Sequence, residues 1–251
     1  MARIVSVHSF RGGTGKSNIT ASLATQVARL GHRVGIVDTD IQSPGIHVLF
    51  GMDEQRITHA LNDYLWGRCD IDAAAYPVDL EAVAGKLYLI PSSLKTGEIA
   101  RVLREGYDVT LLNDGFRDLI ERLTLDYLFI DTHPGLNEET LLSIAISDVL
   151  FIVMRPDRQD YQGTGVTVEV ARKLDVPHLY VVVNKVLSSF DFDAVRREVE
   201  QTYQADVIAV LPQCDEMMQL ASAGVFALAY PEHPLTRSLA AMADTVVALG
   251  D

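Results

Sequence analysis

The sequence predicts a single α/β domain, spanning residues 1–251, in which helices cover both faces of a mostly parallel, twisted sheet. The chain has 251 residues, 48% of them hydrophobic, and can therefore bury one large core. Apolar runs alternate with helical patterns almost throughout. Most of these runs do not alternate apolar with polar residues, which is typical of strands that are covered on both faces. Such a succession predicts a parallel sheet wrapped by helices.

The elements follow one another in a regular order. Apolar runs predict strands at residues 4–7, 33–38, 87–91, 127–131, 149–154, 179–184 and 207–211. Helical patterns lie at residues 17–30, 116–123, 162–174, 191–203 and 234–249, and proline at the start of the last suits a first helical position. Segment 53–86 is the least regular. Short helices are expected there around residues 57–65, together with insertions specific to this protein's partners.

The composition argues against several classes of partner. The formal net charge is −13, and residues 190–251 hold three arginines, no lysine and ten acids, so we expect no nucleic-acid binding. No apolar run reaches 18 residues and no leader precedes the first strand, which predicts a cytoplasmic protein. Residues 238–249 lack lysine and arginine, so no stable membrane anchor is expected. Cys69 and Cys214 lie too far apart in the sequence for a paired metal site and are expected to be ordinary thiols.

A phosphate-binding loop is the clearest motif. Residues 11–17 read Arg-Gly-Gly-Thr-Gly-Lys-Ser between the first predicted strand and the first predicted helix. The glycines let consecutive amides converge on a polyphosphate at the positive end of the helix. Lys16 is expected to reach the β and γ phosphates, and the Ser17 hydroxyl to bind Mg²⁺. The residues expected to contact nucleotide here are Gly12, Gly13, Thr14, Gly15, Lys16, Ser17 and Asn18.

The sequence of this loop departs from the general pattern GxxxxGK[ST], because Phe10 stands where that pattern has glycine. It fits the narrower pattern KGGxGK[ST], with Arg11 in place of the first lysine, and resembles the deviant Walker A loop of the MinD/ParA ATPases. The resemblance implies a P-loop NTPase fold of the MinD-like (SIMIBI) type. It also implies that Arg11 crosses a sandwich dimer to the partner's phosphates, where it could serve as an arginine finger. The competing interpretation is a surface arginine that never enters a partner site.

Carboxylates follow two of the predicted strands, at the sheet edge where ligands bind in such folds. Asp38 and Asp40 follow the second strand; the resemblance assigns the Mg²⁺ shell to Asp38 and the attacking water to Asp40, whereas the segment alone also fits a simple turn. Asp131 opens a segment that looks like the DTPPG switch of the family, with Asp131 holding Mg²⁺ and the Gly135 amide sensing the γ phosphate. His133 replaces a proline of that switch. We favour a structural or partner-facing role for His133 over a general base.

Base selection is predicted from two later segments. Asn184 and Lys185 end a strand, but Leu187 stands where NKxD would place the carboxylate that recognises guanine, so adenine is favoured. By resemblance to the family's later motifs, Asn184 and the loop containing Pro212 and Asp215 surround the base. A lone asparagine there would otherwise be a capping residue. Residues 155–160 are expected to cap the following helix, with a dimer rim as the alternative.

Together the motifs predict an ATPase that binds ATP, ADP and Mg²⁺, with Lys16, Asp40 and Arg11 in the catalytic roles and Ser17, Asp38 and Asp131 at the metal. The resemblance implies an ATP-dependent homodimer that acts as a positioning, partitioning or assembly switch through an unidentified protein partner. One alternative is a nucleotide-binding scaffold that hydrolyses little, because Arg11 disturbs the contact across the dimer. Another is a metallocofactor-insertion ATPase, which the absence of paired cysteines disfavours.

Overall fold

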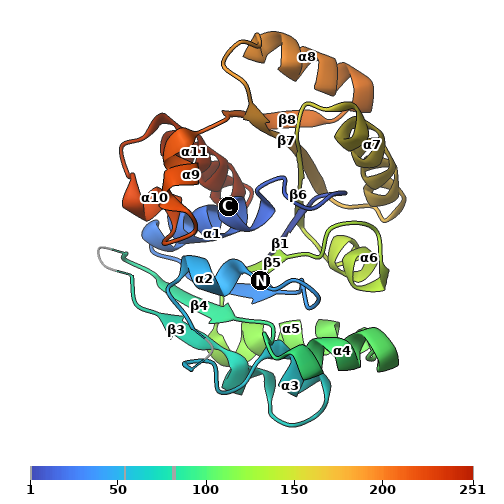
Figure 1. Cartoon of the computed structure of the whole chain (residues 1–251), viewed down its shortest axis with the longest axis vertical. Helices are drawn as coiled ribbons and strands as arrows, with labels where there is room; N and C mark the ends of the chain where they lie inside the picture. The colour runs from blue at the N-terminus through green and yellow to red at the C-terminus, as the bar shows by residue number, and fades with distance from the viewer. Residues whose placement is uncertain (1, 54, 81–82, 251) are drawn as a thin grey trace.

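The computed structural model describes residues 2–53, 55–80 and 83–250, and in this part of the chain eight strands form one sheet. Their order across the sheet is β3-β4-β2-β5-β1-β6-β7-β8, and every neighbouring pair is parallel except β3 with β4 (Figure 1). The strands are β1 (Arg3–His8), β2 (Arg33–Asp38), β3 (Tyr76–Val78), β4 (Lys86–Ile90), β5 (Tyr127–Asp131), β6 (Val149–Met154), β7 (His178–Val186) and β8 (Asp206–Pro212). The predicted fold class is confirmed.

Helices cover both faces of the sheet, and alternate residues of the central strands enter different cores. One face carries α1 (Lys16–Arg29), α2 (Ile46–Leu49), α9 (Asp215–Leu220), α10 (Phe226–Ala229) and α11 (Pro234–Ala248). The other carries α3 (Leu61–Leu65), the 3₁₀ helix η1 (Ile71–Ala74), α4 (Thr96–Glu105), α5 (Thr110–Leu123), α6 (Glu138–Ala145), α7 (Arg158–Lys173) and α8 (Phe192–Tyr203). Phe129 packs under α1 and α11, whereas its neighbours Leu128 and Ile130 pack against α5. This alternation explains why apolar runs without polar residues form the strands.

The structure corrects several predicted boundaries. Helix α7 begins at Arg158, four residues before the predicted start, because the Asp157 side chain accepts hydrogen bonds from the amides of Gln159 and Asp160. Helix α5 likewise begins at Thr110 and not at residue 116. Helices α4 and α6 and the antiparallel edge strand β3 were not predicted. Within segment 53–86 the expected short helix is α3, and residues 54, 81 and 82 of that segment lie outside the described residues, as do Met1 and Asp251.

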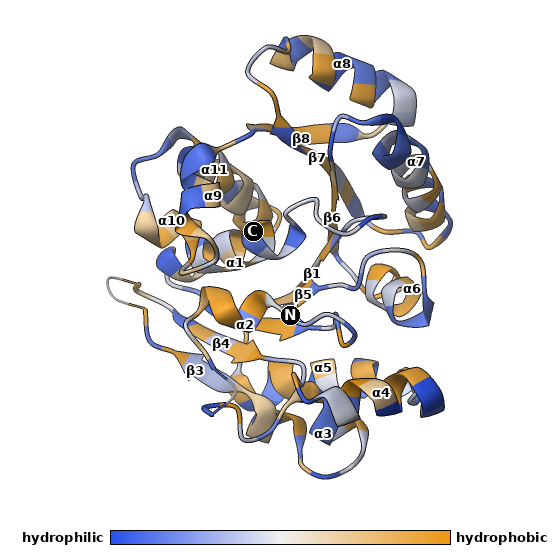
Figure 2. Ribbon diagram, viewed as in Figure 1, coloured by the Kyte–Doolittle hydropathy of each residue, from blue (hydrophilic) through white to orange (hydrophobic). Residues whose placement is uncertain are grey.

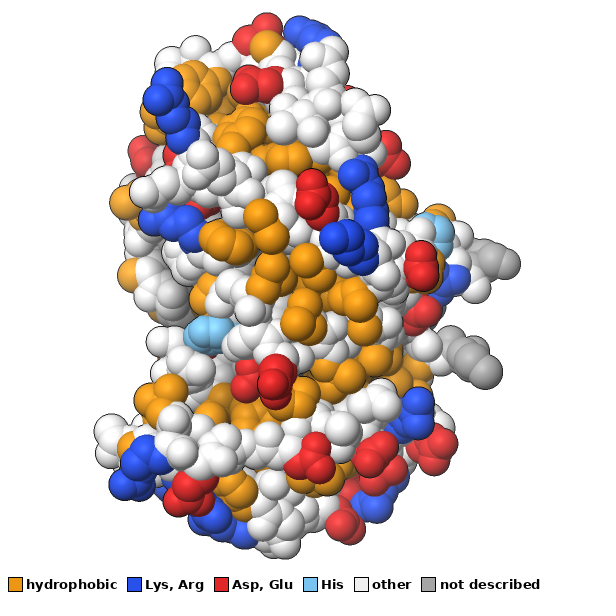
Figure 3. All heavy atoms as spheres, turned by 90° about the vertical axis from the view of Figure 1, so that its right-hand side faces the viewer, with side chains coloured by type: hydrophobic (Ala, Val, Ile, Leu, Met, Phe, Trp, Pro, Cys, Tyr) orange, Lys and Arg blue, Asp and Glu red, His pale blue; other side chains and the backbone are white. Residues whose placement is uncertain are grey.

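Hydropathy follows the layers. The central strands are mostly apolar, while polar residues gather on the outward faces of α4, α7 and α8 (Figure 2). On the side where α6 and α7 face outward, hydrophobic side chains gather across the middle of the surface (Figure 3). The large exposed apolar side chains on these two helices are Leu141 and Val166. No described helix combines the length and apolar character needed to span a membrane.

Candidate functional site

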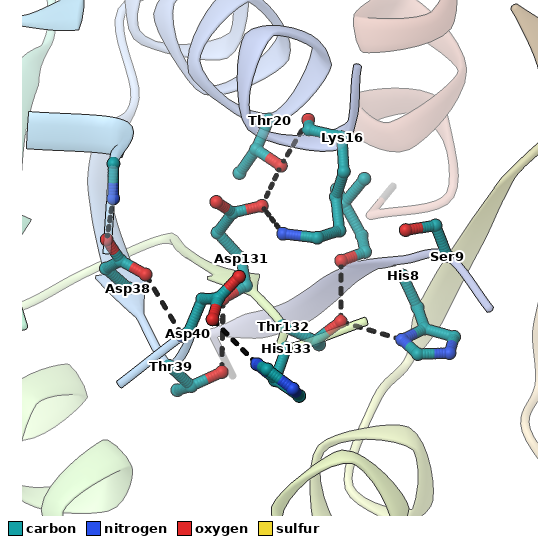
Figure 4. Close-up of polar contacts among 12 residues, drawn as sticks. His8, Ser9, Lys16, Thr20, Asp38, Thr39, Asp40, Asp131, Thr132 and His133 are labelled. Atoms are coloured by element: carbon teal, nitrogen blue, oxygen red, sulfur yellow. Dashed lines mark hydrogen bonds and ion pairs between the residues drawn. The ribbon is translucent and has the colours of Figure 1, made fainter. Parts of the chain in front are cut away.

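The motif residues meet at the carboxyl ends of β1, β2 and β5, at the edge of the sheet where α1 begins. The sheet register places Asp131 of β5 beside Asp38 of β2 on one side and beside Val7 of β1 on the other. Strand β5 therefore lies between the two strands that lead into the phosphate loop and the Asp38 loop. Figure 4 shows the side chains of Asp38, Asp40 and Asp131 gathered in front of Lys16. The parallel topology therefore brings together residues that lie more than a hundred positions apart in the sequence.

The loop before α1 has the backbone of an anion cradle. Gly13 and Gly15 have φ of 79° and 96°, in the left-handed region that favours glycine. Gly15 is the N-cap of α1 and no side chain caps that helix, which leaves its first amides available to an anion. The Thr14 hydroxyl is buried and has no hydrogen-bond partner among the described residues. An uncapped helix end beside an unpartnered hydroxyl fits a bound phosphate group.

Side chains of β7 hold the outer side of this loop. The amide nitrogen of Asn184 donates to the Thr14 carbonyl at 2.8 Å, and Lys185 Nζ donates to the Gly13 carbonyl at 2.8 Å. A β-carbon built on Gly15 would lie 2.5 Å from the same Asn184 nitrogen, so glycine is required here for close approach as well as for φ. Asn184 thus shapes the cradle, a contact that its sequence position did not reveal.

Lys16 is buried and paired with a carboxylate. Its Nζ lies 2.8 Å from Asp131 Oδ1, and the Thr20 hydroxyl donates to the same oxygen at 3.0 Å. Lys16 and Asp131 are 7% and 1% exposed, so the pair is shielded from water. An ammonium in this position can exchange its carboxylate partner for phosphate oxygens, since both are anionic acceptors at similar distance.

Asp38 forms no ion pair with any residue that the structure describes. Burial, and next the neighbouring Asp131 carboxylate, raise the pKa of Asp38 to about 8. Its two oxygens accept hydrogen bonds from the backbone amides of Asp40 and Gly45, at 3.0 and 3.2 Å, so Asp38 also fixes the start of the loop that follows β2. Two buried carboxylates side by side, with the Ser17 hydroxyl on the adjoining helix turn, are oxygen donors of the kind that Mg²⁺ prefers.

Asp40 contacts the loop after β5 through a histidine. His133 Nδ1 lies 2.7 Å from Asp40 Oδ1, and the Ser43 amide donates to that same oxygen at 3.1 Å (Figure 4). Gly135, in the same loop as His133, has φ of 89°, and its amide donates to the Ser9 carbonyl at 3.1 Å. The loops after β1, β2 and β5 are therefore linked to one another by hydrogen bonds.

A second histidine, His8, lies at the end of β1 and is fully buried. Its Nδ1 lies 2.8 Å from the Thr132 hydroxyl, which itself donates to the Val7 carbonyl, so the histidine nitrogen is the donor. Its Nε2 has no hydrogen-bond partner among the described residues. Burial, and next the charge of Lys16, lower the pKa of His8 to about 3, and the ring is therefore neutral.

Arg11 points toward α7 of its own chain. Its Nη1 lies 3.4 Å from Asp160 Oδ1 and 3.7 Å from Asp157 Oδ1, and its side chain is 40% exposed. Asp160 is buried and also accepts from the Arg155 backbone and guanidinium. Within residues 155–160, Asp157 therefore caps α7, as was predicted for this segment, while residues 158–160 lie inside the helix; Asp157 and Asp160 also hold Arg11, which was not predicted.

Phe10 lies against the same helix. A β-carbon built on Gly163 would be 2.0 Å from Phe10 Cδ1 and 2.3 Å from Cγ, so the aromatic ring occupies the space that any other residue at position 163 would fill. The residue that departs from the general phosphate-loop pattern thus packs the loop onto α7.

A cavity of about 360 Å³ opens beside the cradle, large enough for part of a nucleotide. Gly15, Asn18, Asn184 and Pro212 line it, which brings four of the predicted nucleotide residues together. Its apolar walls come from α9 and α11 and were missed in the sequence: Met217, Met218, Leu235 and Leu239. Asp215 is the first residue of α9; it is exposed and does not line the cavity.

Cys214, which lines this cavity, lies close to Glu216 and His233, and one ligand-type atom of each lies within 4.8 Å of the others. The Leu235 amide, however, donates to His233 Nδ1 at 3.1 Å, which leaves the proton of the neutral ring on Nε2. Nε2 therefore directs an N–H toward Glu216, 3.8 Å away, and the Cys214 thiol donates to the same carboxylate. The thiol hydrogen bond and the contact between His233 and Glu216 bring these three side chains together.

Comparisons with known proteins find sequence relatives and solved structures of the same fold. The family model ParA, described as the NUBPL iron-transfer P-loop NTPase, matches residues 1–247. An uncharacterised ATP-binding protein of Methanocaldococcus jannaschii is 27% identical over 248 residues, covering 98% of this chain and 88% of the relative. An iron-sulfur cluster carrier protein of Clostridium perfringens is 31% identical over 184 residues, covering 72% and 62%. The structure of the septum site-determining protein MinD of Pyrococcus horikoshii, complexed with Mg-ADP, superposes with a TM-score of 0.82 at 20% identity and covers 100% and 98%.

Proposed function

The chain belongs to the MinD/ParA family of P-loop NTPases, and from that premise we propose that it is a Mg²⁺-dependent ATPase whose ATP-bound form dimerises and acts on a protein partner. The observation that carries the proposal is the buried pair of Lys16 and Asp131, set beside Asp38 at the uncapped N-terminus of α1. Without a ligand, burial and the neighbouring Asp131 raise the pKa of Asp38, so the second carboxylate is costly to ionise there. Phosphate for Lys16 and Mg²⁺ for the carboxylates would complete the site.

In the proposed mechanism, Lys16 leaves Asp131 for the β and γ phosphates, and the amides of Gly12 to Ser17 hold the remaining phosphate oxygens. Ser17, Asp38 and Asp131 would hold Mg²⁺, which supplies charge neutralisation on the phosphates when it is bound. Asp40 orients the attacking water, and the Gly135 amide exchanges its hydrogen bond to the Ser9 carbonyl for one to the γ phosphate. Asn18, Asn184 and Pro212 surround an adenine ring in the adjoining cavity.

Arg11 is proposed to act across a two-fold interface on the phosphates of the partner subunit, where its planar fork can contact two oxygens. In the single chain the guanidinium contacts Asp160 and Asp157, so this action requires that Arg11 exchange those carboxylates for phosphates. Asp160 keeps Arg155 as a partner after the exchange. The exchange therefore does not leave a buried carboxylate without a cation.

Light scattering tests the dimer directly. ATP with Mg²⁺, or a slowly hydrolysed analogue, should convert monomer to dimer, and ADP should not. Arg11→Ala should still bind ATP as a monomer while weakening the dimer and lowering turnover, and Arg11→Lys should restore both. A variant that dimerises and hydrolyses like the wild type would show that Arg11 is a surface residue.

A second candidate function, a nucleotide-binding scaffold with little hydrolysis, is favoured by the contact between Arg11 and Asp160. If Arg11 remains on α7 when ATP binds, the dimer lacks the crossing charge and the nucleotide stays intact. Quantifying ADP formed in single turnover decides between the two. Asp40→Ala should retain nucleotide and lose most hydrolysis if the protein is an ATPase.

Metallocofactor insertion fits the described cysteines poorly. Cys69 lies between α3 and η1, which pack on the α5 side of the sheet, whereas Cys214 lies in the core on the α11 side. One chain therefore cannot bring its two thiols to a shared cluster without refolding. Iron and sulfide analysis of protein purified without oxygen tests this alternative.

The protein partner of the proposed ATPase would be identified by affinity capture with a non-hydrolysed ATP analogue.

A further inference from the structure

His133 joins the two loops that carry the proposed water-orienting and phosphate-sensing groups. One loop follows β2 and contains Asp40, and the other follows β5 and contains His133 and Gly135. The histidine Nδ1 lies 2.7 Å from Asp40 Oδ1, and the two side chains are 22% and 14% exposed. A carboxylate only accepts hydrogen bonds, so Nδ1 is the donor in this contact.

The contact determines which carboxylate oxygen of Asp40 is available. Oδ1 accepts from His133 and from the Ser43 amide, whereas Oδ2 has no hydrogen-bond partner among the residues that the structure describes. One oxygen anchored by two donors fixes the plane and direction of the carboxylate. The other oxygen is then presented in a defined direction to a water molecule.

The histidine itself rests on a fixed backbone. The Thr140 hydroxyl of α6 donates to the His133 carbonyl at 3.3 Å, and the Gly135 amide donates to the Ser9 carbonyl at 3.1 Å. Two residues before His133, Asp131 is held by Lys16 and Thr20. The imidazole therefore extends from a loop that is tied on both sides to the phosphate cradle.

We propose that His133 is a positioning residue for hydrolysis, whose Nδ1–H holds Asp40 in the direction required by the attacking water and couples the loop after β2 to the loop after β5. The inference rests on the proposed ATPase function. In the switch pattern that this segment resembles, proline stands at position 133 and has no side-chain donor, so the contact is a property of this chain.

Two isosteric substitutions separate hydrogen bonding from packing. His133→Asn keeps an N–H donor at the position of Nδ1, whereas His133→Leu has the same branched shape and no donor. We expect His133→Leu to lower the single-turnover rate by about 10- to 100-fold, because Asp40 loses its fixed direction. His133→Asn should stay within about threefold of the wild type, and His59→Leu, an exposed histidine elsewhere, serves as the control.

These substitutions should change the rate of ATP hydrolysis without changing the affinity for nucleotide. The affinity for a non-hydrolysed ATP analogue, measured by calorimetry, should remain within about twofold in all three variants, because His133 contacts neither Lys16 nor the amides of the cradle. In an Asp40→Ala background, His133→Leu should cause no further loss of rate, since the residue acts through Asp40. A large additional loss in that background would overturn the inference.

Hydrogen exchange gives a readout that does not depend on hydrolysis. The amide of Ser43, which donates to Asp40 Oδ1, should exchange faster in His133→Leu than in the wild type or His133→Asn, because Asp40 loses one of its two anchors. A wild type that exchanges normally but never hydrolyses ATP would remove the ATPase proposal and leave the coupling of the loops standing. Equal exchange in the Leu and Asn variants, or equal rates, would overturn the role of His133.

Discussion

The two ends of the candidate nucleotide site are built by different chemistry. At the phosphate end, polar side chains that are buried or half-buried are held by ion pairs and hydrogen bonds: Lys16 to Asp131, His133 to Asp40, and Asp38 to the backbone amides of its own loop. At the base end, methionine and leucine side chains of α9 and α11 line a cavity of about 360 Å³. The first end holds its ligand by charge that is costly to bury, whereas the second offers shape and apolar surface. Substitutions at the phosphate end should therefore change nucleotide affinity strongly and differently for ATP and ADP. Substitutions at the base end should change both affinities slightly and by the same factor.

The largest effect is expected from Lys16→Ala. The variant loses the cation that faces the β and γ phosphates and leaves Asp131 buried without its ammonium, so ATP affinity should fall by at least about 100-fold. Calorimetry measures it, with the exposed Lys173→Ala as the control. Unchanged affinity in Lys16→Ala would show that the loop does not bind phosphates, and the comparison between the two ends would collapse.

His8 should make the folded protein sensitive to acid. Its pKa is lowered to about 3 in the folded state, whereas the unfolded chain takes up a proton near pH 6.5. Stability from this residue is therefore present above pH 6.5 and is lost as the pH falls toward 3, by about 2 kcal/mol between pH 7 and pH 5. Urea unfolding of wild type and His8→Asn at both pH values measures the difference. An equal loss of unfolding free energy in the wild type and His8→Asn between the two pH values would exclude His8 as the cause of the acid sensitivity.

Asp38 should make the free energy of unfolding depend on pH in the opposite direction. Because its pKa is raised to about 8 in the folded state, the unfolded chain releases the proton first, and the free energy of unfolding falls as the pH rises from about 4 to 8. Below pH 6.5 the slopes of Asp38 and His8 oppose each other, so the effect of Asp38 is clearest between pH 6.5 and 7.5, at about 1 kcal/mol. Asp38→Asn should flatten this part of the profile, and Mg²⁺ with ATP should do the same in the wild type. A slope that persists in Asp38→Asn would assign it to another group.

The smallest effect is expected at the base end. Met217→Ala removes part of the cavity wall, and the affinities for ATP and ADP should fall by the same factor, about three- to tenfold. Calorimetry with both nucleotides gives the ratio of their affinities, which should stay unchanged here and change in Lys16→Ala. A change in that ratio for Met217→Ala would mean that the two ends are coupled.

The sequence was informative where one local segment determines the structure. The apolar runs at residues 33–38, 127–131 and 149–154 correspond residue for residue to β2, β5 and β6, since strands covered on both faces consist of near-continuous apolar residues. Strand β3 is three residues long, contains Pro77 and lies at the sheet edge, so only its pairing with β4 defines it. Helix α6 carried a usable signal that was overlooked: Asn137 caps it, and two glutamates follow in its first turn.

In the candidate site, too, the sequence predicts only what a local segment or the sheet topology determines. The glycines, Lys16 and the carboxylates at strand ends could be found because topology alone brings them together. The partners of Arg11 and Asp40 could not, because Asp160 and His133 reach them only after α7 and the loop after β5 are packed. The wall of the base cavity comes from α9 and α11, some two hundred residues after the cradle, and no local pattern marks Met217 or Leu239 as ligand-facing.

The contact between Phe10 and Gly163 restricts the order in which this sequence can change. Any side chain at position 163 would overlap the Phe10 ring, whereas replacing the ring by a smaller residue leaves room for a β-carbon on α7. Position 10 must therefore change before position 163, and a chain that acquired alanine on the helix first would pass through a destabilised intermediate. We expect the two sites to covary among close relatives, with an aromatic residue at the first only where glycine occupies the second. For protein engineering, the general phosphate-loop glycine can be restored here at the cost of a void, and a larger residue on α7 is the substitution that would fill it.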